Sequence, residues 1–80
     1  MEPAQVKALL AAGLEGCDIE VSSDGSHYNV VVVGEVFEGL RAVKRQQLIY
    51  GLLNQAIASG QIHAVHMKLF TPVEYRQHTT

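Results

Sequence analysis

The clearest signal of the fold lies in residues 62–75, which read IHAVHMKLFTPVEY. Within residues 62–70, valine, methionine and leucine alternate with small or polar side chains, and a period of two is typical of a β-strand. Thr71, Pro72 and Glu74 then supply an N-cap, a first-turn proline and a capping-box glutamate. This stretch therefore predicts a strand that leads directly into a short C-terminal helix.

The segment before this strand predicts a long helix over residues 40–59. Gly60 follows as a residue suited to the left-handed turn that ends many helices. Gly51 costs about 1 kcal/mol relative to alanine inside a helix, so we expect a break or bend near it. The apolar stripe of this helix comprises Ile49, Leu52, Leu53, Ala56 and Ile57.

The first half of the chain predicts one helix and a β-hairpin. A helix begins at Pro3, because a first-turn proline loses no intrahelical hydrogen bond. Residues 17–22 alternate in polarity and place Cys17 on the apolar face, and residues 28–33 contain four consecutive valines. Residues 23–26, Ser-Asp-Gly-Ser, are turn formers between the two strands.

The order helix, strand, strand, helix, strand, helix constrains the topology. The second strand, the long helix and the third strand form a crossover, which implies parallel pairing and a right-handed connection. We predict an α+β, two-layer domain over residues 1–80, with helices on one face of a mixed three-stranded sheet.

Composition narrows the classes of function. The 80 residues are 48% apolar and 18% charged, with a net charge of −2 and a single cysteine. A chain this short buries one core and has little room for a deep catalytic cleft. One cysteine excludes an internal disulfide and fits a reducing cytoplasm. We expect no membrane span, no signal peptide and no enzyme.

Two groups of residues together resemble the BolA family, and within it the IbaG-like members. One group is Phe37-Glu38-Gly39 with Lys44-Arg45-Gln46-Gln47 and Tyr50, and the other is Ile62-His63-Ala64-Val65 with Thr71-Pro72-Val73-Glu74-Tyr75. The resemblance covers roughly residues 5–76. It implies a class II KH-like fold, in agreement with the predicted order of elements.

The resemblance implies a metal-ligand role for His63. BolA-like proteins are thought to share a [2Fe–2S] cluster with a monothiol glutaredoxin and glutathione, using this histidine. A cluster needs four ligands, and the chain has one cysteine and four separated histidines, so we expect no cluster in the isolated chain. His27 is the candidate second ligand, with a solvent-exposed strand residue as the alternative. Cys17 is interpreted as a buried hydrophobe with an unreactive thiol.

The start of the long helix carries Arg41, Lys44 and Arg45. These are either a solvated helix start or a basic patch for a partner or nucleic acid. Gly34 and Gly39 lack the Gly-x-x-Gly spacing with which KH domains grip a nucleic-acid backbone. The alternative function is a KH-like, nucleic-acid-binding transcriptional regulator of the stress or morphology type that uses this basic patch. Because the KH glycine spacing is missing, we expect such a regulator to bind DNA only weakly. A weak homodimer is left open.

Overall fold

The helices and strands follow one another in the predicted order, helix, strand, strand, helix, strand, helix, with one short 3-10 helix added before the long helix. The computed structural model describes residues 2–25 and 27–79, so Ser26 of the predicted turn lies outside the described residues. The elements are α1 (Pro3–Gly13), β1 (Asp18–Asp24), β2 (His27–Val33), the short 3-10 helix η1 (Glu35–Phe37), α2 (Ala42–Ala58), β3 (Ala64–Phe70) and α3 (Pro72–Thr79). None of the helices in these residues is long and apolar enough to cross a membrane.

The sheet has the order β1-β2-β3, with β2 in the centre. β1 pairs with β2 antiparallel, and β2 pairs with β3 parallel. Val33, at the end of β2, is opposite both Asp18 of β1 and Phe70 of β3. The predicted hairpin, crossover and mixed sheet are therefore confirmed.

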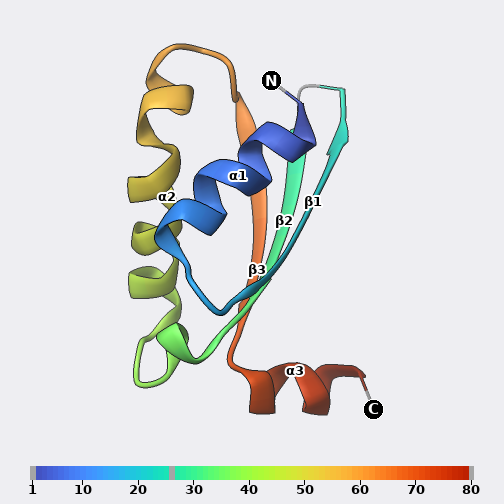
Figure 1. Ribbon diagram of the computed structural model, residues 1–80, viewed down its shortest axis with the longest axis vertical. Coiled ribbons are helices and arrows are strands. Elements are labelled where there is room, and N and C mark those ends of the chain that lie inside the picture. Colours follow the sequence, from blue (N-terminus) through green and yellow to red (C-terminus); the bar gives the residue numbers. More distant parts are fainter. Residues whose placement is uncertain (1, 26, 80) are drawn as a thin grey trace.

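One face of the sheet carries the core. α1 and α2 lie over this face (Figure 1), because both helices present apolar stripes that must be buried against something. Phe37 of η1 and Ile62, which precedes β3, complete the core. The largest buried side chains are Phe37, Leu10, Ile49, Leu53, Ile62, Val6, Val30 and Val32.

α3 lies apart from the other two helices, at the end of the sheet (Figure 1). The ring of Phe70, the last residue of β3, lies 5.6 Å from that of Tyr75 and 5.1 Å from that of His78. Phe70 alternates with Leu69, which packs against the core, and so points to the opposite face. The prediction of helices on one face of the sheet is therefore correct for α1 and α2. α3 turns away at Thr71 and lies at the end of the sheet (Figure 1).

Two predicted elements begin two residues later than expected. α2 begins at Ala42, because Arg41 is extended with φ −75° and ψ 165°. It then runs unbroken through Gly51 to Ala58, so the expected break is absent. β3 begins at Ala64 rather than at residue 62, which leaves His63 in the connection just before the strand.

Candidate functional site

The two candidate ligands, His27 and His63, lie at the same end of the sheet. His27 is the first residue of β2 and pairs with Ala64, the first residue of β3. His63 immediately precedes Ala64, and both histidines are exposed. This end of the sheet, where β1 ends and β2 begins, is at the top of Figure 1. Parallel pairing therefore brings together two histidines that are 36 positions apart.

The connection before β3 anchors His63 to the core through its neighbour. Ile62 is only 1% exposed, and its N–H donates to the Ala56 carbonyl at 3.3 Å. Gly60 makes the turn after α2 with φ +81°, a value that favours glycine. With Ile62 fixed inward, His63 is held at the surface beside the sheet.

The number of available ligands limits what this end can hold. Among the described residues, no group of three or more His, Cys, Asp or Glu side chains is placed to bind a metal ion. A [2Fe–2S] cluster needs four ligands, and imidazole can replace thiolate at some of them. Two exposed histidines therefore fit part of a shared ligand set and are too few for a cluster held by this chain alone.

Cys17 lies at the opposite end of the sheet. It precedes Asp18, which pairs with Val33 at the end of β2. Burial and then the neighbouring Asp18 carboxylate raise the pKa of the Cys17 thiol. The side chain is half-buried against the core, next to Gly34. Cys17 thus packs against the core as predicted, but it is only partly buried, and β1 starts one residue after it.

His66 is separate from the histidine pair. It lies within β3, opposite Asn29 and three residues beyond His63, with an exposed side chain. Its neighbour Met67 packs against the core, so His66 points to the face away from α1 and α2. It is a suitable control position for tests of His63.

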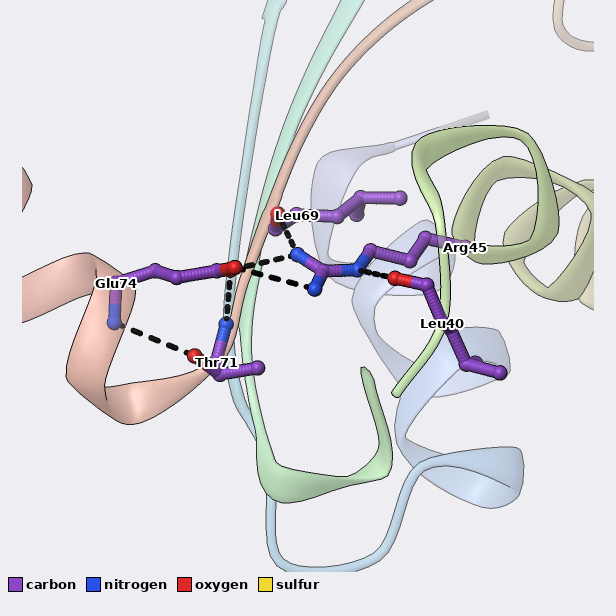
Figure 2. Close-up of polar contacts among 5 residues, drawn as sticks. All are labelled: Leu40, Arg45, Leu69, Thr71 and Glu74. Atoms are coloured by element: carbon purple, nitrogen blue, oxygen red, sulfur yellow. Dashed lines mark hydrogen bonds and ion pairs between the residues drawn. The ribbon is translucent and has the colours of Figure 1, made fainter. Parts of the chain in front are cut away.

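Arg45 is the centre of a polar cluster at the far end of β3 (Figure 2). Its Nε donates to the Leu40 carbonyl at 2.9 Å, and its Nη1 donates to the Leu69 carbonyl at 3.2 Å. The guanidinium also binds both carboxylate oxygens of Glu74, at 2.6 and 3.2 Å. It lies 5.8 Å from the centre of the Phe37 ring. Arg45 is thus engaged within the protein.

Glu74 serves both the ion pair and the helix cap. Its carboxylate accepts the Thr71 N–H at 2.9 Å, while its own N–H donates to the Thr71 hydroxyl at 3.2 Å. The predicted capping box is therefore present. The hydrogen bond from Arg45, followed by that from the Thr71 backbone, lowers the pKa of Glu74 from 4.5 to about 2.

The structure divides the predicted basic patch. Arg41 and Lys44 are exposed, whereas Arg45 is turned toward Glu74. Sequence reasoning missed this ion pair, because its members are 29 positions apart and only the fold brings them together. The capping-box position of Glu74 was the one available signal. A binding role for Arg41, Lys44 and Arg45 stays a prediction.

Comparison with known proteins identifies the family. The sequence model described as BolA-like protein matches residues 7–74. The chain belongs to the BolA family. It is 44% identical over 75 residues to the acid stress protein IbaG of Escherichia coli, covering 94% of this chain and 89% of that protein. The predicted family and its IbaG-like branch are thus confirmed.

Solved BolA structures share the fold. A bolA protein homologue from Coxiella burnetii superposes with a TM-score of 0.80 at 31% identity, over 95% of this chain and 97% of that one. The BolA domain of SufE1 from Arabidopsis thaliana gives a TM-score of 0.79 at 32% identity, over 90% and 93% of the two chains. The predicted fold class is therefore confirmed.

The name of a Haemophilus influenzae relative, BolA, refers to DNA binding rather than to acid stress. This relative is called a DNA-binding transcriptional regulator and is 43% identical over 51 residues, which are 64% of this chain and 48% of that protein. The names of these relatives are those of a stress protein and a regulator, and none is that of an enzyme.

Proposed function

We propose that this BolA-family protein is a cytoplasmic adaptor in iron–sulfur cluster assembly and trafficking. It would hold a [2Fe–2S] cluster jointly with a monothiol glutaredoxin and would catalyse no reaction. The observation that carries the proposal is the placement of His27 and His63, both exposed, at one end of the sheet. An exposed incomplete ligand set is what a cluster shared between two proteins requires.

The cluster is cargo, and each partner supplies part of its ligands. His63 would offer a neutral imidazole nitrogen, and His27 would be the second candidate from this chain. A glutaredoxin thiolate and a glutathione thiolate would complete the set of four. Since a protonated imidazole cannot ligate iron, the shared cluster should weaken in mildly acidic solution.

The position of Cys17 supports imidazole rather than thiolate ligation from this chain. Cys17 lies at the other end of the sheet from His27 and His63. Its raised pKa also keeps the thiol protonated, whereas a metal ligand must be a thiolate. The cysteine is therefore badly suited to share a cluster with either histidine.

Reconstitution tests the proposal. The chain is mixed with a monothiol glutaredoxin, ferrous iron, sulfide and glutathione, and visible absorption and circular dichroism are recorded. We expect a cluster spectrum different from that of glutaredoxin alone, and no cluster when glutaredoxin is left out. His27→Ala should lower cluster retention less than His63→Ala. A spectrum identical to that of glutaredoxin alone, with no co-elution of the two proteins, would refute the proposal.

The second candidate function is regulation through nucleic acid. The printed name of the Haemophilus influenzae relative and the exposed Arg41 and Lys44 favour it. Against it, the engaged Arg45 leaves few cations for phosphate. The two functions separate in one comparison, because a regulator binds a DNA sequence in the absence of iron and glutaredoxin.

A further inference from the structure

β3 has a free edge, because it ends the three-stranded sheet. In a parallel strand, the N–H and C=O of one residue point to the same side, and successive residues alternate sides. The Phe70 carbonyl accepts the Gly34 N–H and so faces β2. It follows that the backbone N–H and C=O groups of Ala64, His66 and Lys68 also point toward β2. The backbone groups of Val65, Met67 and Leu69 point toward the free edge.

Arg45 marks where this free edge ends. The Leu69 carbonyl points outward as the alternation requires, and it accepts a hydrogen bond from Arg45 Nη1 at 3.2 Å. Within residues 2–25 and 27–79, no hydrogen bond uses the outward backbone groups of Val65 and Met67. The strand therefore offers a short row of unpaired donors and acceptors that stops at the Arg45–Glu74 ion pair.

A groove runs beside this row of backbone groups. It has a volume of about 510 Å³ and lies between β3 and the start of α2. Met67 and Leu69 supply apolar side chains from β3, and Leu40 and Ala42 supply them from the other side. Side chains on one face of an added strand would point into this groove, since they alternate between the two faces.

Charge distinguishes the two edges of the sheet. β1, at the other edge, carries the exposed carboxylates of Asp18, Glu20 and Asp24 and no lysine or arginine, and such charges oppose strand addition. The groove beside β3 is lined by three charged residues, Arg41, Arg45 and Glu74, and of these Arg45 and Glu74 pair with each other. No hydrogen bond or ion pair occupies the Arg41 side chain within the described part of the chain. An acidic segment therefore suits the β3 edge and not the β1 edge.

The geometry points to β3 as a docking edge for an extended, acidic segment of a partner protein. The segment adds as a fourth strand along Val65, Met67 and Leu69. Apolar side chains enter the groove, and a carboxylate binds Arg41. This surface goes beyond the shared cluster, because it involves neither His27 nor His63 and requires no iron.

Amide hydrogen exchange followed by NMR tests this surface directly. The probe is a synthetic peptide of eight residues that alternates valine and threonine and carries two aspartates at one end. It is added to the full chain without glutaredoxin or metal. We expect new protection of the Val65, Met67 and Leu69 amides, with no change at His66 and Lys68, which already donate to β2. This alternation within one strand is the signature of strand pairing.

Variants of the protein and of the peptide test the Arg41–carboxylate contact and the backbone pairing separately. Arg41→Glu should weaken peptide binding by about tenfold or more, the equivalent of about 1.4 kcal/mol. Lys44→Glu is the matched control, because Lys44 is exposed in the first turn of α2, three residues after Arg41, and lies outside the groove lining. A peptide N-methylated at alternate residues should lose binding, since it lacks the edge donors.

Three outcomes would overturn the proposal. One is the absence of binding at millimolar peptide. Another is equal binding of the N-methylated peptide or of Arg41→Glu, which would exclude strand addition or the carboxylate contact. The third is the same pattern of protected amides with an oligonucleotide of eight thymidines and none with the peptide, which would assign the groove to nucleic acid.

Discussion

Arg45 joins three parts of the chain with one side chain. Its guanidinium binds the Leu40 carbonyl before α2, the Leu69 carbonyl at the end of β3, and the Glu74 carboxylate in α3. A planar guanidinium can make these bonds at once because its donors point in fixed, separate directions. The sequence predicted the Thr71–Glu74 cap from local spacing alone. It could not predict the role of Arg45, which depends on contacts between distant segments.

The Arg45–Glu74 pair should make stability depend on pH. The pKa of Glu74 falls from 4.5 to about 2 on folding. A lowered folded-state pKa contributes stability that is complete above about 4.5 and is lost as the pH falls to about 2. Urea unfolding of the wild type and Glu74→Gln should therefore give a difference in unfolding free energy that shrinks across this range. A constant difference would contradict the role of the charged carboxylate.

Gly34 is small because Cys17 occupies the space beside it. A Cβ atom at Gly34 would overlap the Cys17 Sγ. Its backbone is extended, with φ −169°, so an alanine suffers no backbone strain there. We expect Gly34→Ala to destabilise the fold by about 1–3 kcal/mol through overpacking. Chemical denaturation measures this loss, and adding Cys17→Ala should restore part of it. Unchanged stability in Gly34→Ala would show that the Cys17 side chain can move aside without cost.

Local sequence patterns correctly predicted those helices and strands whose formation depends on neighbouring residues. Alternation predicted β3, turn residues predicted the hairpin, and the capping residues predicted the start of α3. The sequence did not predict that α3 lies apart from α1 and α2. Its position depends on contacts of the Phe70 ring with the rings of Tyr75 and His78. Of the break or bend expected near Gly51, the break is absent, because α2 is continuous from Ala42 to Ala58. Packing of Ile49 and Leu53 in the core holds the helix through the weak position between them.

Gly51 offers a stabilising substitution in α2. It is exposed inside the helix, and a Cβ atom there would meet nothing within 4 Å. Gly51→Ala should raise the unfolding free energy by about 0.5–1 kcal/mol, because alanine loses less conformational freedom in a helix. Thermal or urea unfolding measures the change. A loss of stability would mean that the exposed face of α2 needs glycine for a reason that the packing does not reveal.

Across the whole molecule, the two ends of the sheet carry different groups. His27 and His63 lie where β2 and β3 begin, and Cys17 and the Arg45 cluster lie where those strands end. The sequence predicted the parallel pairing that brings His27 near His63. It could not determine the strand register, on which their positions depend, because register follows from packing of the whole core.

The charge distribution predicts weak binding to DNA. With Arg45 engaged by Glu74, Arg41 and Lys44 remain as the exposed cations at the start of α2. Two phosphate contacts would give a log–log salt slope of about −1.8 on duplex DNA. We expect weak binding without sequence preference that disappears near physiological salt, as measured by fluorescence anisotropy. Tight binding to one sequence, with single base changes costing about 1–3 kcal/mol each, would favour the regulator.

The most direct test of the shared-cluster account compares His63→Ala with His66→Ala. Both residues are exposed histidines near the start of β3, but only His63 lies at the end of the sheet beside His27. Each variant is reconstituted with a monothiol glutaredoxin, glutathione, iron and sulfide, and the visible circular dichroism of the complex is followed over time. The account predicts an altered spectrum and faster cluster loss for His63→Ala, with wild-type behaviour for His66→Ala. An unchanged spectrum and unchanged cluster lifetime in His63→Ala would contradict it.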